Sequence, residues 1–268
     1  MDLSNIKIIF IDIDGTLVNS KKEITKKTKD SIKRVVEKGI KVVLISGRDI
    51  IHTIEKSKEA NASSVVISTN GAKIYDYENK KVIFEDIFPK QKIVDVWNYC
   101  MFHKIGLILK SNEFVYYNKY SLVKKGTKYK LLNDISECED FNVSQILIMS
   151  NECEEIENMH KYALNKEMFV TSFSSSYFEN TISNYYSIDV NNSNVSKGTA
   201  ISYLLNYLNI KKEESLCFGD YYNDLDMFEA SGIKVAMRNA ADTLKEKSDF
   251  ITKSNDENGI AYFLNKYL

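Results

Sequence analysis

The sequence predicts an α/β protein in which a Rossmann-like core with a parallel sheet is interrupted by an inserted α+β domain. Near-continuous apolar runs alternate with helical segments in residues 1–70, as in strands that are buried on both faces of a parallel sheet. Residues 194–268 return to this rhythm. From about residue 85 to residue 187 the strands are more amphipathic and the alternation is looser. We therefore expect a core of residues 1–84 and 188–268 and an insert of residues 85–187.

The elements of the core follow from apolar periodicity and from turn residues. In the first core segment we expect three strands, at Ile8–Ile11, Lys41–Ile45 and Val65–Ser68. The helices between them are expected at Thr25–Lys38, which Gly39 stops, and at Asp49–Ala60. In the second core segment we expect a helix, a strand, a short helix and two short strands, at Gly198–Asn209, Leu216–Phe218, Asn223–Ala230, Val235–Ala236 and Phe250–Ile251.

The insert is expected to contain five strands and two helices. The strands are expected at Ile105–Leu109, Phe114–Tyr117, Ser144–Ile148, Phe169–Phe173 and Tyr185–Asp189. Gly106 weakens the first of these predictions, because glycine is unfavourable inside a strand. The helices are expected at Gln91–His103 and Cys153–Leu164.

Composition excludes several classes of protein. With 268 residues, 44% of them hydrophobic and 27% charged, the chain can form one large domain or two modest ones and is not globally disordered. The 36 Lys and Arg residues balance 37 Asp and Glu residues, which argues against a nucleic-acid-binding surface spread over the chain. The four cysteines form no CxxC pair, and Cys217 is expected in the core. No apolar stretch predicts a membrane span or signal peptide, so we expect a cytoplasmic protein.

The first strand is followed directly by the motif Asp12-Ile13-Asp14-Gly15-Thr16. Ligands of an open parallel sheet bind beyond the carboxyl ends of its strands. Two acidic residues so close together are unfavourable there without a cation or a division of roles. An ordinary turn at the end of a strand is the simpler interpretation, but the complete motif is too rare by chance to favour it.

A second acidic cluster, Gly219-Asp220-Tyr221-Tyr222-Asn223-Asp224, follows a strand late in the chain. By itself it could be the solvated N-terminus of a helix, where acidic side chains are favourable. Its pairing with the first motif favours a functional interpretation instead. Carboxylates that converge from two strand ends provide the oxygen ligands that Mg²⁺ requires.

Two further segments are weaker signals. Ser46-Gly47-Arg48 follows the second strand, and its hydroxyl and backbone N–H groups could hold a phosphate, although such a sequence is common in turns. Lys197 begins a helix, where a cation opposes the helix dipole. Considered alone, Lys197 would be a solvated surface lysine.

In their order along the chain, these segments resemble the four motifs of the haloacid dehalogenase superfamily. Asn70-Gly71-Ala72 and the segment Ala236-Met237-Arg238-Asn239-Ala240 further resemble the Cof-type hydrolase branch, although Arg238 stands where glycine is most usual. Only residues 15–45 separate Asp14 from Ser46, so no cap domain fits there, whereas residues 47–196 separate Ser46 from Lys197. This spacing resembles the type-II arrangement, and the α/β composition of the insert resembles subtype IIB.

The resemblance implies a mechanism with Asp12 and Asp14 as catalytic residues. Asp12 would be the nucleophile that forms an aspartyl phosphate, and Asp14 would act as general acid and then as general base. Mg²⁺ would be bound by Asp12, by the backbone carbonyl of Asp14 and by Asp220, with Asp224 acting directly or through water. The groups that bind phosphate or substrate would be Ser46, Gly47, Arg48, Asn70, Lys197 and Asn223.

The sequence therefore predicts a Mg²⁺-dependent phosphatase of small phosphorylated metabolites, with sugar phosphates as the first choice of substrate and pyridoxal or flavin phosphates next. A phosphomutase of the same superfamily and a non-catalytic binding or regulatory protein are the alternatives. We expect neither a nucleic-acid nor a membrane partner, and a monomer or weak homo-oligomer. The insert is expected to select the substrate, because no other segment is large enough to cover the rest of the ligand.

Overall fold

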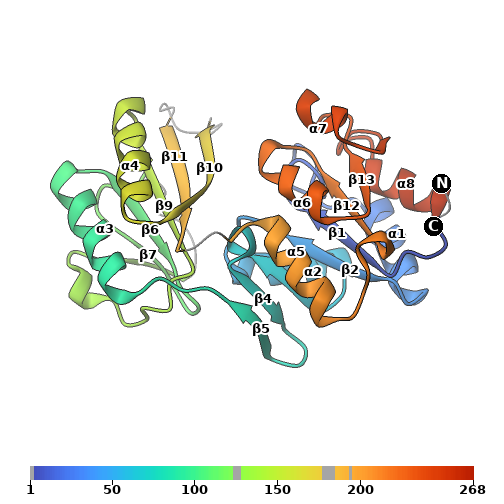
Figure 1. Cartoon of the computed structure of the whole chain (residues 1–268), viewed down its shortest axis with the longest axis horizontal. Helices are drawn as coiled ribbons and strands as arrows, with labels where there is room; N and C mark the ends of the chain where they lie inside the picture. The colour runs from blue at the N-terminus through green and yellow to red at the C-terminus, as the bar shows by residue number, and fades with distance from the viewer. Residues whose placement is uncertain (1–2, 123–127, 177–184, 193–194) are drawn as a thin grey trace. The chain divides into compact units, whose positions relative to one another are not determined.

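A computed structural model describes residues 3–122, 128–176, 185–192 and 195–268 (Figure 1). The chain divides into a core unit, Met1–Phe84 with Ser196–Leu268, and an insert unit, Glu85–Val195. The insert therefore ends at Val195 and not at residue 187, where we predicted its end. The difference arises because Tyr185–Asn191 forms a strand that pairs within the sheet of the insert and not with the core.

The core unit contains an eight-stranded sheet with the strand order β14-β13-β12-β1-β2-β3-β4-β5. The strands are β1 (Ile8–Asp12), β2 (Lys41–Ile45), β3 (Val65–Ser68), β4 (Lys73–Asp76), β5 (Lys81–Glu85), β12 (Ser215–Gly219), β13 (Ile233–Ala236) and β14 (Phe250–Ile251). From β14 to β3 all pairings are parallel, which confirms the predicted α/β class with a parallel sheet. β1 is buried along its whole length and lies between β2 and β12.

The β4 and β5 strands were not predicted from the sequence. β4 pairs antiparallel with β3 and extends the sheet beyond its parallel part. Both strands are partly exposed and begin and end with a charged residue, so they lack the long apolar run typical of a buried parallel strand.

Helices and short 3₁₀ turns connect these strands. The helices are α1 (Lys26–Glu37), α2 (Ile50–Ala60), α5 (Lys197–Tyr207), α6 (Leu225–Ala230), α7 (Asp242–Glu246) and α8 (Gly259–Tyr267). The 3₁₀ turns are η1 (Thr69–Gly71), η3 (Lys212–Glu214) and η4 (Tyr222–Asp224). α1 and α2 begin one residue later than predicted, because Thr25 and Asp49 are their N-caps and accept hydrogen bonds from the first turn through their side chains.

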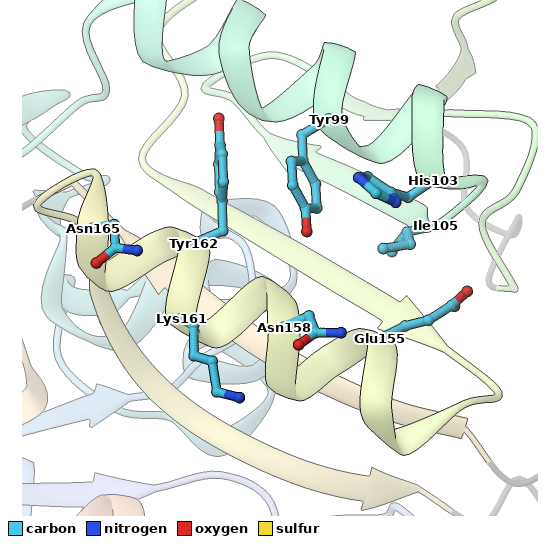
Figure 2. Close-up of a pocket in the computed structure, with 8 residues that line it drawn as sticks. All are labelled: Tyr99, His103, Ile105, Glu155, Asn158, Lys161, Tyr162 and Asn165. Carbon is cyan, nitrogen blue, oxygen red and sulfur yellow. The ribbon is translucent and has the colours of Figure 1, made fainter.

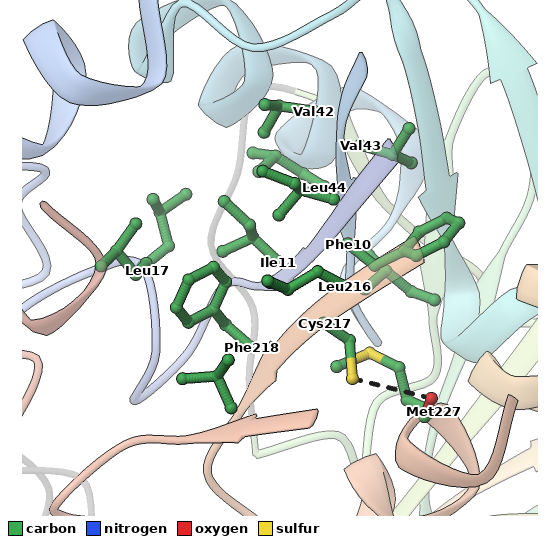
Figure 3. Close-up of a cluster of buried hydrophobic side chains, with 14 of the residues drawn as sticks. Phe10, Ile11, Leu17, Val42, Val43, Leu44, Leu216, Cys217, Phe218 and Met227 are labelled. Carbon is green, nitrogen blue, oxygen red and sulfur yellow. Dashed lines mark hydrogen bonds between the residues drawn. The ribbon is translucent and has the colours of Figure 1, made fainter. Parts of the chain in front are cut away.

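Apolar side chains from β1, β2 and β12 form the centre of the core unit (Figure 3). Phe10, Val43 and Phe218 are among its fully buried members. Cys217 is also fully buried, and its thiol lies 3.8 Å from the carbonyl oxygen of Met227, which confirms the prediction of a core residue.

The insert unit contains a six-stranded sheet with the strand order β10-β11-β9-β6-β7-β8. Its strands are β6 (Gly106–Lys110), β7 (Val115–Tyr117), β8 (Tyr129–Leu131), β9 (Gln145–Ser150), β10 (Phe169–Ser176) and β11 (Tyr185–Asn191). The pairings are antiparallel except that between β7 and β8. Gly106 does not interrupt β6; a Cβ at this position would lie 2.7 Å from the Met149 side chain, so the close packing requires glycine.

Two helices, α3 (Lys90–His103) and α4 (Cys153–Asn165), pack on one face of this sheet, and a 3₁₀ turn, η2 (Ile135–Glu137), precedes β9. A groove of about 330 Å³ lies between the two helices (Figure 2). The rings of Tyr99, His103 and Tyr162 lie along it, with ring centroids 4.3 Å apart for Tyr99 and His103 and 4.2 Å apart for Tyr99 and Tyr162. None of the predicted site residues lines this groove. In the described residues of the chain, no helix has the length and apolar character needed to span a membrane.

Candidate active site

The parallel strands bring the predicted site residues to one edge of the core sheet. Asp12 is the last residue of β1, Ser46 follows the end of β2 and Asp220 follows the end of β12. β2 and β12 both pair with β1 in parallel, so the carboxyl ends of the three strands meet at the same edge. The residues of the first, second and last motifs therefore lie close together, as the sequence predicted.

Three carboxylates form a cluster at this edge. One oxygen from each of Asp12, Asp220 and Asp224 lies within 4.8 Å of the others. Gly15, with a φ of +83°, permits this approach, because a Cβ there would lie 2.1 Å from an Asp220 oxygen. Asp224 is held by the backbone, since its Oδ2 accepts hydrogen bonds from the N–H groups of Asp220 (2.9 Å) and Tyr221 (3.2 Å).

Lys197 places a positive charge within this cluster. Its Nζ donates to Oδ1 of Asp12 at 2.5 Å and to Oδ1 of Asp224 at 2.7 Å. The side chains of Lys197 and Asp224 are 1% exposed, so this is a buried ion-pair network and not a solvated surface lysine. Burial disfavours the charged amine, but the two carboxylates outweigh this effect and raise the pKa of Lys197.

The remaining negative charge in the cluster is unfavourable. Burial, together with the charges of Asp224 and Asp220, raises the pKa of Asp12 well above its usual value, although Lys197 opposes this. Burial and Asp224 raise the pKa of Asp220 to about 7. Three ionised carboxylates and one ammonium group have a net charge of two minus, which a divalent cation would neutralise. Oxygen ligands and this charge fit Mg²⁺.

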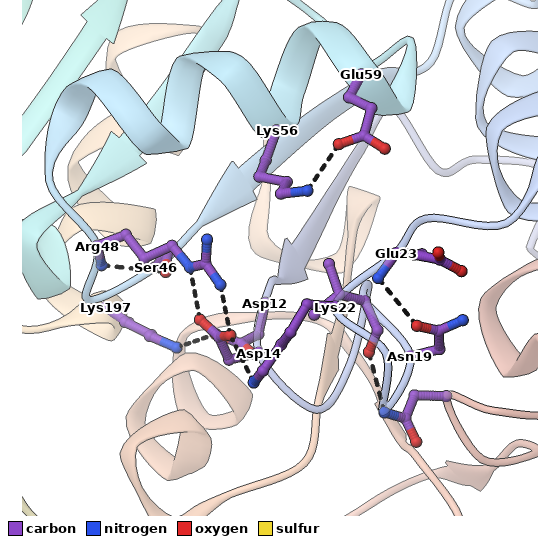
Figure 4. Close-up of polar contacts among 12 residues, drawn as sticks. Asp12, Asp14, Asn19, Lys22, Glu23, Ser46, Arg48, Lys56, Glu59 and Lys197 are labelled. Atoms are coloured by element: carbon purple, nitrogen blue, oxygen red, sulfur yellow. Dashed lines mark hydrogen bonds and ion pairs between the residues drawn. The ribbon is translucent and has the colours of Figure 1, made fainter. Parts of the chain in front are cut away.

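The Asp14 side chain lies outside this carboxylate cluster and pairs with Arg48 (Figure 4). Nε of Arg48 donates to Oδ2 of Asp14 at 2.8 Å, and the Nη2 group donates to Oδ1 at 2.7 Å. Nζ of Lys22 lies 3.5 Å from Oδ1. Burial raises the pKa of Asp14, but hydrogen bonds and charge from Arg48 and Lys22 outweigh it and lower the pKa below its usual value. In this geometry Asp14 is an ionised carboxylate.

Apart from Lys197, the predicted phosphate-binding residues come from the loop after β2 and from the 3₁₀ turns η1 and η4. Ser46 is buried and its Oγ accepts a hydrogen bond from the N–H of Arg48 at 3.2 Å. The backbone N–H of Asn70 donates to the Ser46 carbonyl at 3.0 Å, and a Cβ on Gly47 would lie 2.9 Å from Oδ1 of Asn70. Asn223 lies half-buried on η4, next to Asp224.

The turn that carries Asn70 has an unusual backbone. Thr69, Asn70 and Gly71 all have positive φ angles, of 51°, 53° and 103°. For a β-branched residue such as Thr69 this conformation is a genuine outlier. A Cβ on Gly71 would lie 2.2 Å from the Ser196 carbonyl, so the turn also packs against the start of α5. It therefore contacts both the loop with Ser46 and the loop that leads to Lys197.

Sequence reasoning did not assign roles to several residues that the structure brings to the site. The Thr16 hydroxyl donates to Oδ1 of Asp220 at 2.7 Å, and Nδ2 of Asn239 donates to the Gly15 carbonyl at 2.8 Å. Thr16 belongs to the motif that begins with Asp12, and Asn239 belongs to the segment that resembles the Cof-type branch, so both motifs could have indicated a role. No sequence pattern singles out Lys22, which is a lysine in an exposed loop. Arg238, the departure from the usual motif, pairs with Glu257 at 2.9 Å.

Comparison with known proteins gives matches over nearly the whole chain. A family model of haloacid dehalogenase-like hydrolases matches residues 9–264. A 5-amino-6-(5-phospho-D-ribitylamino)uracil phosphatase from Bacillus subtilis (strain 168) is 26% identical, with 98% of each chain covered. The crystal structure of a haloacid dehalogenase-like hydrolase from Bacteroides thetaiotaomicron has a TM-score of 0.83 and 26% identity, covering 98% of this chain and 100% of the other. A subclass IIB sugar phosphatase of the superfamily has a TM-score of 0.76 and 22% identity, covering 97% and 98%.

Proposed function

The chain belongs to the haloacid dehalogenase-like hydrolase family and is a phosphatase, and from this premise we propose that it hydrolyses small phosphorylated metabolites in a Mg²⁺-dependent reaction. The predicted resemblance to the Cof-type branch is confirmed. We further propose sugar phosphates as the preferred substrates and an aspartyl phosphate as the intermediate.

The observation that carries this proposal is the buried cluster of Asp12, Asp220, Asp224 and Lys197. When its three carboxylates are ionised, its net charge of two minus and its oxygen ligands fit one Mg²⁺ ion. When bound, the ion would stabilise the charge of the transferring phosphoryl group. Positioning and electrostatic stabilisation account for most of the catalysis in phosphoryl transfer.

Asp12 is the residue to which we assign the nucleophilic attack. One of its carboxylate oxygens forms a bond to phosphorus while the bond from phosphorus to the leaving oxygen breaks. Lys197 orients Asp12 and opposes the rise in its pKa, because its ammonium group donates to the Asp12 carboxylate at 2.5 Å. In the second half of the reaction, water attacks phosphorus, the bond to Asp12 breaks and inorganic phosphate leaves.

Asp14 is the residue to which we assign proton transfer. It would donate a proton to the leaving oxygen and later accept one from the attacking water. The paired, ionised state of Asp14 suits the second role, whereas the first requires that the carboxyl group be released from Arg48 and protonated. We propose that Arg48 exchanges Asp14 for the substrate phosphate, because a guanidinium group binds either anion in a bidentate manner.

The other proposed ligands surround the phosphate position. Ser46 and the backbone of Gly47 form the loop after β2, and the turn with Asn70 lies against this loop. Asn223 comes from η4, which follows β12 on the other side of β1, and Lys197 comes from the start of α5, which packs against both η1 and α6. These groups would spread the charge of the phosphoryl group, and any phosphomonoester would be held in the same way.

Discrimination among substrates is the role that we propose for the insert. In its sheet, Leu109 and Val190 point toward α3 and α4, so the neighbouring Lys110 and Asp189 point to the opposite face. Nζ of Lys110 lies 3.7 Å from Oδ1 of Asp189 and donates to Oε1 of Gln145 at 2.5 Å. The pair is only 12% and 18% exposed and shares its face with the aromatic and apolar side chains of Ile108, Tyr117, Tyr129, Met149 and Tyr185.

This combination suits a ligand that carries both hydroxyl groups and a carbon skeleton. Charged side chains hold hydroxyl groups by hydrogen bonds, and aromatic faces pack on carbon. A relative that acts on a phosphorylated ribityl compound supports the same substrate class. Phosphorylated cofactors such as pyridoxal or flavin phosphates are the next candidates.

The test is phosphate release from a panel of sugar phosphates, phosphorylated cofactors and nucleotides, with Mg²⁺ and after exhaustive chelation. We expect turnover of at least one sugar phosphate that disappears on chelation and in Asp12→Asn, because an amide is a poor nucleophile and a weaker metal ligand. Asp242→Asn, which changes a carboxylate that is 93% exposed, is the matched control and should retain full activity. Undiminished activity in Asp12→Asn or after chelation would disprove the proposal, and a requirement for a bisphosphorylated activator would indicate a phosphomutase.

A further inference from the structure

The helix that begins with Lys197 is held by a carboxylate that the proposed mechanism does not use. Oδ2 of Asp226, in α6, accepts a hydrogen bond of 2.9 Å from the backbone N–H of Gly198, the second residue of α5. The two helices approach each other closely here, since a Cβ on Gly198 would lie 2.4 Å from the Asp226 carbonyl oxygen. Asp226 therefore contacts the backbone directly after the buried lysine.

The N-terminus of α5 needs such a partner. The first N–H groups of a helix have no acceptor within the helix. The Ser196 side chain accepts from the N–H of Thr199, which leaves the N–H of Gly198 for Asp226. A carboxylate is also favourable at the N-terminus of a helix, whereas the cation of Lys197 is unfavourable there. Asp226 thus offsets a cost that the position of Lys197 creates.

Asp224 and Asp226, which are close in the sequence, bind two successive residues, Lys197 and Gly198. Asp224 binds the Lys197 ammonium group at 2.7 Å, and Asp226 binds the N–H of the next residue. The side chain and the backbone of the Lys197–Gly198 pair are therefore fixed by residues two positions apart in the sequence.

From this geometry we propose that Asp226 is a positioning residue, which fixes the start of α5 and so holds Lys197 against Asp12. Asp226 acts through Lys197 and does not touch the reacting atoms. The inference rests on the proposed phosphatase site, in which Lys197 stabilises the transferring phosphoryl group.

Removal of the Asp226 carboxylate should weaken stabilisation of the transition state more than it weakens substrate binding. In Asp226→Ala the N–H of Gly198 loses its partner and the start of α5 can shift. A displacement of about 1 Å at a catalytic group costs up to about 10²-fold in rate, so we expect kcat to fall by about tenfold or more. KM should change little, because the other phosphate ligands remain. Asp226→Asn keeps an oxygen acceptor and should restore most of the rate.

The experiment compares Asp226→Ala, Asp226→Asn and the control Thr25→Ala in the full-length protein. Thr25 is the N-cap of α1 in the same unit and accepts from the N–H of Thr28, so its loss removes a comparable helix cap away from the site. We expect Thr25→Ala to lower the Tm without changing kcat, and Asp226→Ala to lower kcat and to weaken inhibition by orthovanadate by a similar factor. A change in kcat of less than twofold in folded Asp226→Ala, or an equal loss in Asp226→Asn, would overturn the proposal.

A second measurement does not depend on turnover. Lys197 is 1% exposed and bonded to two carboxylates, so acetic anhydride should acetylate it slowly. Mass spectrometry should show faster acetylation of Lys197 in Asp226→Ala, but not in Asp226→Asn or Thr25→Ala. An unchanged rate would overturn the positioning role, whereas an inactive wild-type protein with the expected acetylation pattern would contradict only the proposed function.

Discussion

The core unit and the insert unit bury polar groups of different kinds. The core buries charge: Asp12, Asp224 and Lys197 are at most 7% exposed, and the single ammonium group compensates only part of the negative charge. The insert buries neutral amides, of which Asn118 is an example. Its Oδ1 accepts from the N–H of Leu107 at 3.0 Å, and its Nδ2 donates to the Ile105 carbonyl at 2.8 Å.

The difference indicates what each unit's interior is for. An amide whose hydrogen bonds go to the backbone fixes neighbouring segments, and no ligand is needed to complete it. A buried cluster with an excess of negative charge is unfavourable unless a cation binds to it. The buried charges of the core therefore point to a catalytic role, whereas the buried amides of the insert stabilise its fold. Any role of the insert in recognition must then come from its sheet face with Lys110 and Asp189.

The largest expected effect concerns the acid and base chemistry of the core. Asp14→Asn removes the group that we assign to proton transfer and should lower kcat by about 10²–10⁴-fold. The loss should be greatest for substrates with poor leaving groups, which need protonation, and smaller for an ester of an acidic phenol. Single-turnover phosphorylation with a series of leaving groups measures this dependence. An equal loss for all leaving groups would contradict the acid role.

Much of this core could be predicted from the sequence, because the relevant signals are local. Asp12 ends an apolar strand and Asp220 directly follows another, and parallel strands bring such positions to one edge. The ion pair between Asp14 and Arg48 could not be predicted in the same way. It depends on the path of two loops, and the sequence shows only that both residues lie at strand ends.

The other features that could not be predicted from the sequence have a related physical cause. Thr16 and Asp220 lie 204 positions apart, and only the assembled sheet shows that they are bonded. The bond from Gly198 to Asp226 joins two helix starts whose separate sequences do not indicate it. The β4 and β5 strands were missed because they are partly exposed, and the end of the insert was misplaced because β11 pairs with β9. In each case the information lies in tertiary pairing and not in local pattern.

The second prediction tests whether the insert affects recognition alone. Lys110→Ala should lower kcat/KM for a preferred sugar phosphate by about tenfold, since a hydrogen bond from a charged group contributes about 1.5–3 kcal/mol. It should leave kcat/KM for p-nitrophenyl phosphate and the dependence on Mg²⁺ unchanged, because that ester carries no sugar hydroxyl groups. The control is Lys161→Ala, on α4 and therefore on the helix-covered side of the insert. Equal losses for both substrates would show that Lys110 supports the fold and not recognition.

The smallest expected effect concerns a charged pair of the core in which the histidine is largely exposed and only the aspartate is buried. Nδ1 of His52 lies 2.6 Å from Oδ2 of Asp49, the N-cap of α2, and the His52 side chain is 44% exposed. The hydrogen bond to Asp49 raises the pKa of His52, although burial opposes this. A raised pKa in the folded state stabilises the fold below the unfolded pKa of about 6.5, and this stabilisation is lost as the pH rises through the folded value.

His52→Gln should therefore lower the Tm more at pH about 5.5, where histidine is charged in both states, than at pH about 8.5, where it is neutral. Because solvent reaches the His52 ring and screens its charge, we expect the difference to be small beside the effects of the buried charges. Thermal unfolding of both proteins at the two pH values measures it, and the Asp49→Asn background, which keeps an N-cap oxygen, should abolish the pH dependence. A difference in Tm that is constant or grows with pH would show that His52 is not stabilised by Asp49. The contrast between exposed and buried charge in the core would then need another explanation.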